Sequence, residues 1–267
     1  MTEATAASGI LAGKTALVMG LANKYGIAWP IGQAFHAAGA RVAFTHLNER
    51  VERDVTKLTA ELPGATSYQC NVDNDDELDT LATKVAADLE RVDILVHAIA
   101  YAPADEMKNR FLHTTREGFR IAHNTSVYSL IAAARMVVPL MPDGGSIITL
   151  SYLGADRAFP RYNVMGVAKA ALESTVRYLA LDLGEQKIRV NAISAGPVRS
   201  FSARGIPGFD EMMDSAADRA PIKGRLDPAQ LGTTAVFLAS DGAAAITGET
   251  LFVDGGYHVM GMASDLV

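Results

Sequence analysis

The sequence predicts a single α/β domain of the doubly wound Rossmann type, with about seven parallel strands and helices on both faces of the sheet. Short apolar runs alternate with helical patterns of twelve or more residues almost throughout the chain. Strands this apolar are buried on both faces, as in a parallel sheet covered by its crossover helices. No composition break or internal repeat divides the 267 residues, so one domain is expected over 1–267.

The first half of the chain predicts four strands separated by three helices. Gly39 is a typical stop signal for the first helix, and Asn74 or Asp75 can cap the third. The crossovers should be right-handed, and the ligand should bind beyond the carboxyl ends of the strands. The expected strands cover residues 14–20, 41–47, 65–72 and 92–99, and the expected helices cover 26–40, 48–62 and 74–90.

The second half predicts three further strands and three helices. A loop over 100–114 comes first, and the turn signal PDGG precedes the next strand. The glycine-punctuated segment 197–225 is expected to form a substrate-binding lid, and residues 1–12 are expected to be flexible. The expected strands cover 146–152, 188–194 and 250–256, and the expected helices cover 116–140, 162–185 and 228–240.

Composition argues against several classes of protein. The net charge of −6 argues against nucleic acid or an anionic membrane as a partner, and no apolar run approaches the ~18 residues of a membrane span. An early Glu3 and no basic cluster argue against a signal peptide. The single cysteine, Cys70, permits no internal disulfide, which favours a reducing, cytoplasmic location. The six histidines lack metal-ligand spacing, so no metal site is expected.

The turn between the first strand and the first helix is a candidate phosphate site. Gly20 ends the strand and Gly26 opens the helix in MGLANKYGIAWPIGQA. Glycine permits a tight turn and a close backbone approach, and the helix start offers free N–H groups to a pyrophosphate. The spacing is not G-x-G-x-x-G, so a plain tight turn is the alternative.

The second and third strands end where the adenosine half of a dinucleotide would lie. NAD sites often place an acidic residue at the end of the second strand, and NADP sites accommodate an arginine there. Glu49 stands two residues past this strand and Arg50 falls where a helix should begin, which favours NADH over NADPH. Asn71 and Val72 could flank the adenine, and Cys70 is expected to be a small buried residue rather than a reactive thiol.

The stretch RYNVMGVAK holds a tyrosine and a lysine, Tyr162 and Lys169, seven positions apart on an expected helix. Residues seven apart lie on one helix face. A tyrosine ahead of a lysine is a known arrangement for proton chemistry beside a nicotinamide, but the commoner spacing is four. The residue four before Lys169 is Met165, which cannot donate a proton.

Five stretches together resemble the enoyl-acyl-carrier-protein reductases of bacterial fatty-acid synthesis, a divergent branch of the short-chain dehydrogenase/reductases. They are MGLANKYGIA, FTHLNER, LVHAIAYAP, SYLGADRAFPRYNVMGVAKAALES and RVNAISAGPVRS, and the resemblance runs from about Gly13 to Gly256. The run from Ser151 to Lys169 is its most specific part.

The resemblance implies a role for each matching residue. Tyr162 matches the active-site tyrosine, Lys169 the lysine on the nicotinamide ribose, and Tyr152 a second tyrosine at the substrate pocket. Ala102 matches a backbone contact to the substrate carbonyl region. The implied cofactor residues are Gly20, Gly26 and Ile27 at the pyrophosphate, Asn71 and Val72 at the adenine, Ile99 at the nicotinamide, and Val198, Arg199, Ser200, Phe201 and Ser202 in the closing loop.

Three positions depart from the family's usual pattern. Ala100 replaces a glycine near the nicotinamide, Leu47 replaces a polar residue near the adenosine, and Asn71 replaces a common aspartate. None of them touches the expected chemistry.

The seven-residue spacing suits reduction of a carbon–carbon double bond. Tyr162 precedes Met165 by three residues, which moves its backbone by roughly 4.5 Å along the helix. In a 2-enoyl thioester the hydride goes to the β-carbon, and negative charge develops on the thioester oxygen two bonds further away. A neutral tyrosine, with an ordinary pKa of ~10, can donate to that oxygen, and a lysine cation can stabilise the charge.

Two further positions share a register with the ordinary short-chain branch. Tyr152 lies 13 residues before Met165, where that branch keeps its helper serine relative to its tyrosine. A lone tyrosine is more often a packing residue, but Tyr152, Tyr162 and Lys169 in this register argue against coincidence. On the long helix expected over 116–140, Ser126 or Asn124 corresponds to the position where the ordinary branch keeps a structural asparagine. The register favours Ser126, and Asn124 is expected to be a hydrogen-bonding core residue.

The segment after the sixth strand could contact both substrate and carrier. Its apolar residues could wall an acyl tunnel or form the stripe of an ordinary helix. An acyl-carrier protein is acidic, so its docking would need basic residues near the portal, although ordinary surface solvation is the alternative for each. The tunnel candidates are Phe201, Ile206, Phe209, Met212 and Met213, and the docking candidates are Arg199, Arg204, Lys223 and Arg225.

Together these features favour an NADH-dependent reductase of enoyl thioesters on acyl-carrier protein. The resemblance further implies a homotetramer in which the helices Arg116–Leu140 and Tyr162–Glu185 pair across subunits. The alternatives are a carbonyl reductase of the ordinary branch, against which Met165 argues, and a non-catalytic protein that retains the cofactor fold. The presence of both Tyr162 and Lys169 argues against the latter.

Overall fold

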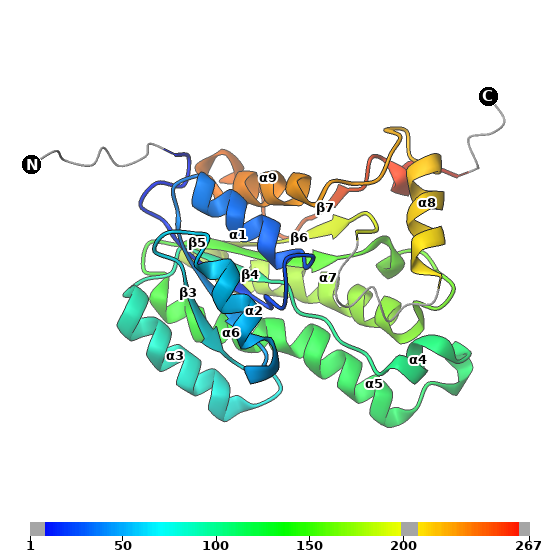
Figure 1. The fold of residues 1–267 in the computed structure, drawn as a ribbon, viewed down its shortest axis with the longest axis horizontal. Helices are drawn as coiled ribbons and strands as arrows, with labels where there is room; N and C mark the ends of the chain where they lie inside the picture. The colour runs from blue at the N-terminus through cyan, green and yellow to red at the C-terminus, as the bar shows by residue number, and fades with distance from the viewer. Residues whose placement is uncertain (1–8, 199–207, 262–267) are drawn as a thin grey trace, which may run out of the picture.

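The computed structural model describes residues 9–198 and 208–261. Within these residues a seven-stranded parallel sheet has the order β3-β2-β1-β4-β5-β6-β7 (Figure 1). The order reverses between β1 and β4, which is the topological switch point where such sheets bind ligands. The strands are β1 (Thr15–Met19), β2 (Arg41–His46), β3 (Thr66–Gln69), β4 (Ile94–His97), β5 (Gly145–Ser151), β6 (Ile188–Ala195) and β7 (Thr250–Val253).

Helices cover both faces of the sheet, so the predicted fold class is confirmed. Residues of α1, α2 and α9 pack in one buried cluster, and residues of α3, α6 and α7 pack in the other. The helices are α1 (Ala28–Ala37), α2 (Glu49–Thr59), α3 (Asp75–Leu89), α4 (Ala104–Lys108), α5 (Arg116–His123), α6 (Ser129–Val137), α7 (Asn163–Leu183), α8 (Phe209–Arg219) and α9 (Pro228–Ala239).

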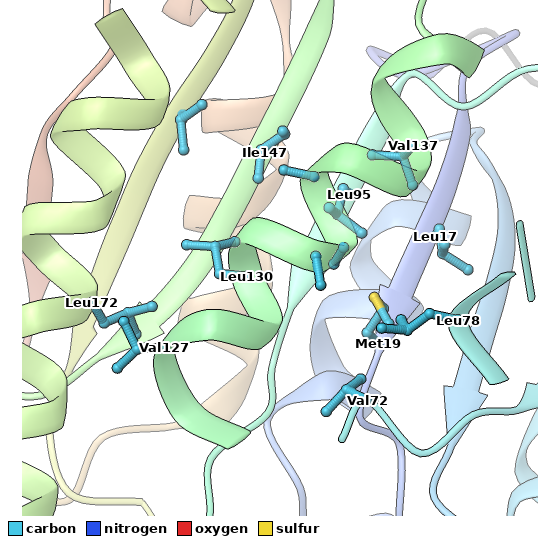
Figure 2. Packing of buried hydrophobic residues seen from close by; sticks show 14 of the residues in the cluster. Leu17, Met19, Val72, Leu78, Leu95, Val127, Leu130, Val137, Ile147 and Leu172 are labelled. Atoms are coloured by element: carbon cyan, nitrogen blue, oxygen red, sulfur yellow. The ribbon is translucent and has the colours of Figure 1, made fainter. Parts of the chain in front are cut away.

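The alternation of side chains along β1 divides the core between the two faces. Leu17 and Met19 point into the cluster beneath α3, α6 and α7, while Ala16 and Val18 point into the other. Figure 2 shows Leu17 and Met19 together with Leu130 on the first of these faces. All these side chains are fully buried, which fixes the register of the central strands.

Local capping residues set several helix boundaries, as predicted. The Asn74 side chain accepts a hydrogen bond from the Asp76 amide at the start of α3. The chain turns at Gly39, with a φ of 93°, directly after α1. Asn48 and Asp227 cap α2 and α9 in the same way.

Three predicted boundaries were wrong. The loop over 100–114 contains α4 and the 3₁₀ turn η1 (Phe111–His113). The helix expected over 116–140 is interrupted by a π-helix, Asn124–Tyr128, and ends in a 3₁₀ turn that contains a proline. The helix expected from Tyr162 begins at Asn163, with Tyr162 as its N-cap residue.

None of the helices in the described ranges is long and apolar enough to cross a membrane. The same residues contain no group of three or more His, Cys, Asp and Glu side chains that could hold a metal ion.

Candidate active site

The predicted site residues follow the carboxyl ends of five different strands. Gly20 follows β1, Asn71 follows β3, Ile99 follows β4, Tyr152 follows β5 and Val198 follows β6. A Cβ at Gly20, whose φ is 96°, would lie 2.5 Å from the Ala98 carbonyl oxygen and 2.9 Å from Ile99 Cγ1. The turn after β1 is therefore pressed against the end of β4, and Gly20 is required there for steric reasons.

The start of α1 is suited to an anion. Unlike α2, α3 and α9, this helix has no side-chain cap at its N-cap residue, Ile27. Unlike α2 and α3, it also has no acidic residue in its first turn. A Cβ at Gly26 would meet only the Asn23 carbonyl, at 3.5 Å. Uncapped N–H groups and the positive end of the helix dipole fit a pyrophosphate, so the chain can hold a dinucleotide at this turn.

The turn after β3 is ordered by its own side chains. The Asn71 amide donates to Glu77 Oε2 at 2.8 Å, and the Asn71 side-chain oxygen accepts from the Asp73 amide at 3.1 Å. Val72 is buried. Cys70 is also buried, and burial raises the pKa of its thiol to about 12, so it is the inert residue that was expected.

Tyr162 lies between two residues with left-handed backbone. Arg161 has a φ of 65° and Asn163 a φ of 39°, a conformation that costs roughly 1–3 kcal/mol for each non-glycine residue. The Asn163 side-chain amide holds this geometry by donating to the carbonyls of Glu106, Met107 and Asn109, at 3.2, 3.3 and 2.7 Å. The segment around α4 thus fixes the backbone that aims Tyr162.

Two tyrosines form the centre of the site. The ring centroids of Tyr152 and Tyr162 are 4.9 Å apart, and Phe159 packs on Tyr152 at 5.1 Å. Burial raises the pKa of both phenols above the ordinary value. The Tyr152 hydroxyl donates to Met212 Sδ on α8 at 3.5 Å, which brings one predicted tunnel residue to the site.

Lys169 is buried rather than solvated. Its Nζ donates to the Leu150 carbonyl at 2.6 Å. Burial lowers the pKa of this lysine to about 8, although nearby Glu173 opposes the shift. Glu173 in turn accepts from the Ser151 hydroxyl at 2.5 Å. The buried ammonium lies beside the end of β5, where it can bind a polar ligand.

The π-helix connects the loops on the two sides of the expected cofactor site. The Ser126 hydroxyl accepts from the Tyr101 amide at 3.0 Å and donates to the Tyr101 carbonyl at 3.1 Å, and Tyr101 neighbours the predicted substrate contact Ala102. On the other side, Asp73 accepts from Asn124 at 2.8 Å and from the Thr125 hydroxyl at 2.6 Å. Asn124 is half-buried, so its predicted place in the core was wrong.

A pocket of about 390 Å³ separates the turn after β1 from α8. It is lined on one side by Tyr25 and Trp29, and on the other by Val198 and Met213. Phe209 begins α8, and Met213 is buried in it. The predicted residues Arg199, Ser200, Phe201, Ser202, Arg204 and Ile206 lie outside the described residues.

The two described docking candidates are engaged with carboxylates or carbonyls of this chain. The Arg225 guanidinium pairs with Asp214 at 2.5 Å, and Lys223 Nζ donates to the Asp218 carbonyl at 2.5 Å. The charge of Arg225 is therefore matched by a carboxylate of α8, and Lys223 is held by a backbone carbonyl of the same helix.

Sequence reasoning missed three residues that shape the site. A Cβ at Gly154 would lie 2.5 Å from Tyr162 Cδ1 and 3.1 Å from Tyr152 Cδ1, so only glycine fits between the two rings. Asn163 holds the backbone beside Tyr162, and the charge of Glu173 opposes the lowering of the Lys169 pKa. An asparagine near the start of the expected helix is the one signal that was available, because asparagine tolerates left-handed backbone.

Parallel strands that end in a dinucleotide-type turn, with a buried tyrosine–lysine pair beyond a neighbouring strand, are the arrangement of the short-chain dehydrogenase/reductases. The chain has the fold of that class. Residues 20–258 match the family described as enoyl-(acyl carrier protein) reductase, and the chain belongs to this family.

Full-length relatives agree with this assignment. The chain is 46% identical over 254 residues to enoyl-acyl-carrier-protein reductase (NADH) of Bacillus cereus, covering 94% of this chain and 99% of the relative. It is 43% identical over 252 residues to the NADPH reductase of Staphylococcus aureus, covering 94% and 98%. The crystal structure of the B. cereus reductase with NADP+ and indole naphthyridinone superposes with a TM-score of 0.93 at 45% identity, covering 95% of this chain and 100% of that one.

Proposed function

We propose that this protein reduces the carbon–carbon double bond of trans-2-enoyl thioesters of acyl-carrier protein, with NADH, in fatty-acid elongation. The observation that carries the proposal is the replacement of the ordinary donor position by buried Met165, with the phenol supplied by Tyr162 one turn earlier. A donor displaced in this way suits an oxygen that is separated from the carbon receiving the hydride.

Tyr162 would act on the thioester oxygen. The bound dinucleotide supplies a hydride to the β-carbon, and negative charge then collects on the oxygen of the resulting enolate. Because burial raises the pKa of Tyr162, its phenol is protonated at neutral pH and can donate a hydrogen bond or the proton itself. Tyr152 packs on the Tyr162 ring and limits its rotation.

Lys169 would hold the nicotinamide ribose. An ammonium has three N–H donors, and one of them is used on the Leu150 carbonyl, which leaves two for ribose hydroxyls. The same positive charge would stabilise an enolate held by Tyr162. Gly20, Gly26 and Ile27 would contact the pyrophosphate, and Asn71, Val72, Ile99 and Val198 would line the remainder of the dinucleotide, continuing into residues 199–202.

NADH is proposed as the preferred cofactor over NADPH. The B. cereus relative is named for NADH and the S. aureus relative for NADPH, so the family alone does not decide. At the end of β2 the exposed Leu47 offers no charge, and Glu49 stands in the first turn of α2 ahead of Arg50. A carboxylate near this end disfavours a 2′-phosphate.

A homotetramer in the cytoplasm is the proposed assembly. Large apolar side chains are exposed on the two helices expected to pair across subunits: Phe119 on α5, and Tyr178 and Leu181 on α7, of which Leu181 is 75% exposed. Large apolar side chains exposed on these two helices support contact with another copy.

The proposal is tested by following oxidation of NADH and NADPH with crotonyl and dodecenoyl thioesters, beside acetoacetyl thioester. Reduction of both enoyl substrates and faster turnover with NADH are expected. Activity on the acetoacetyl compound alone would mean that the chain is a carbonyl reductase. Cofactor binding without turnover of any substrate would mean a non-catalytic protein.

A further inference from the structure

Two side chains hold the short helix α4 in place. With only five residues, α4 is too short to be stable on its own, so its position depends on contacts with the rest of the chain. The Glu106 carboxylate binds α4 to the start of α5, and the Asn163 amide binds it to the start of α7. Figure 1 shows α4 beside the start of α5.

The Glu106 carboxylate is buried against the first turn of α5. The residue is 8% exposed, and its carboxylate accepts hydrogen bonds from the Thr115 hydroxyl at 2.5 Å and the Thr115 amide at 3.1 Å. Thr115 is the N-cap residue of α5, so the negative charge also lies at the positive end of that helix dipole. A Cβ at Gly118 would lie 2.1 Å from Glu106 Oε1, which shows how closely the carboxylate and the helix are packed.

The backbone of the same residue is bound to the residue that follows Tyr162. The Asn163 side-chain amide donates to the Glu106 carbonyl at 3.2 Å. It also donates to the carbonyls of Met107 and Asn109 at the end of α4, where a helix leaves carbonyls without partners of its own. Asn163 has a left-handed φ of 39°, which needs support from its surroundings. Glu106 is therefore bound through its side chain to α5 and through its carbonyl to Asn163.

We propose that Glu106 is a positioning residue for Tyr162: it fixes α4 against α5, and α4 supports the left-handed backbone at Asn163 that aims the phenol. This inference rests on the proposed function, in which Tyr162 donates to the thioester oxygen. A donor must lie within hydrogen-bond distance of its acceptor, and a displacement of about 1 Å can lower a rate on the order of a hundredfold. Glu106 would thus control kcat through Asn163 rather than by contact with the substrate.

The first test measures kcat with crotonyl thioester in two backgrounds, one with Tyr162 intact and one with Tyr162→Phe. Glu106→Ala should lower kcat about tenfold when Tyr162 is present, because the donor is no longer held in place. In the Tyr162→Phe background no donor remains, so the same change should lower kcat by no more than about twofold. The dissociation constant for NADH should not change. Glu106→Gln keeps an oxygen that can accept from Thr115, and it should restore most of the lost activity.

Asp93→Ala is the matched control. Asp93 is also a buried carboxylate that accepts from a backbone amide, that of Thr15 at 2.8 Å, but it precedes β4 at the edge of the sheet opposite the site. Its loss should lower thermal stability and leave kcat within about twofold of the wild type. An equal loss of kcat in Asp93→Ala, or an equal loss from Glu106→Ala in both backgrounds, would mean that Glu106 contributes only to general stability and would overturn the proposal.

Asn163→Gly interrupts the same path at its other end. Glycine tolerates the left-handed φ but cannot donate to α4, so kcat should fall about tenfold even though the backbone conformation is allowed. If Glu106 acts through Asn163, the double variant should lose little more than the larger of the two single variants. Losses that multiply would show that the two residues act independently, and the proposal would then be wrong.

Amide hydrogen exchange over 159–166 measures the same link without any substrate. The Tyr162 amide donates to the Phe159 carbonyl at 3.2 Å, and the Met165 amide donates to the Tyr162 carbonyl at 3.0 Å. Both amides should exchange about fivefold faster or more in Glu106→Ala than in the wild type, and unchanged exchange would contradict the proposal. If the wild type failed to reduce enoyl thioesters while this difference in exchange persisted, the proposed function would be wrong and the link to Tyr162 would stand.

Discussion

Tyr152 and Tyr162 meet edge to face, with their ring planes at 66° and their centroids 4.9 Å apart. Gly154 leaves room for both rings, since any Cβ there would overlap Tyr162. Tyr162 is buried and Tyr152 is half-buried, and the partial loss of solvent raises the pKa of each phenol. Because the Tyr152 hydroxyl already contacts Met212, we infer that Tyr162 is the donor and that Tyr152 positions it.

Replacing Tyr162 by phenylalanine should lower kcat for an enoyl thioester by about a hundredfold or more, the usual contribution of a general acid. The ring contact with Tyr152 survives in this variant, so stability should change little. Tyr152→Phe should lower kcat less than tenfold, because it removes only the contact to a thioether. Steady-state kinetics on the two variants would decide, and a larger loss for Tyr152→Phe would reverse the assignment.

Lys169→Ala should weaken NADH binding more than Tyr162→Phe does. The ammonium is the group expected to reach ribose hydroxyls, whereas the phenol is directed at the substrate. Titration of each variant with NADH, followed by cofactor fluorescence, measures the two dissociation constants. Equal losses of affinity would count against the separate roles of these residues.

The kcat/KM for NADH should fall as the pH rises through about 8. Burial lowers the pKa of Lys169 to about 8, and the protonated form is the one that binds, so the cation is fully present below this pH and is lost above it. The phenols do not contribute in this range, since their pKa values are raised. A pH–rate profile in NADH measures the ionisation in the free enzyme, and a profile that stays flat to pH 10 would contradict the assignment.

The lowered pKa of Lys169 affects stability in the opposite direction, because stability rises with pH where activity falls. Between pH 8 and the ordinary lysine pKa of 10.5, the unfolded chain holds a proton that folded Lys169 lacks. The free energy of unfolding should therefore rise with pH across this interval. Comparison with Lys169→Met, in which this contribution is absent, isolates it from the other titrating groups.

The features that the sequence predicted well are those decided by neighbouring residues. Apolar runs located all seven strands, and the Asn74 cap and the Gly39 turn fixed helix ends, because capping and turn formation act over a few positions. The π-helix could not be found in this way. It depends on Ser126 reaching Tyr101, 25 positions away, and on Asn124 reaching Asp73, 51 positions away.

The same distinction between local and distant contacts applies to the candidate site. The spacing of Tyr162 and Lys169 pointed to one helix face, yet the burial that shifts the pKa of Lys169 comes from packing with distant segments. The left-handed backbone at Arg161 and Asn163 depends on carbonyls after position 105. Residue spacing does not report tertiary contacts of this kind. The sequence could therefore predict the reacting side chains but not the residues that hold them in place.

The π-helix supplies a last prediction, in which two adjacent residues, Thr125 and Ser126, affect the binding of different substrates. Ser126→Ala removes the hydroxyl that bonds both the amide and the carbonyl of Tyr101, and leaving such groups unpaired costs ~1–3 kcal/mol. The loop that carries Ala102 should loosen, so KM for the enoyl thioester should rise about five- to tenfold, with NADH affinity nearly unchanged.

Thr125→Val is the matched change at the residue that precedes Ser126 in the π-helix. It keeps the shape of the side chain but removes the hydroxyl that donates to Asp73, which follows the adenine-side residues Asn71 and Val72. NADH affinity should fall in this variant while KM for the thioester at saturating NADH stays near the wild-type value. Because a merely destabilised fold would weaken both ligands in both variants, only this crossed pattern supports separate positioning by Ser126 and Thr125. If both variants bound both ligands more weakly, the π-helix would have only a packing role.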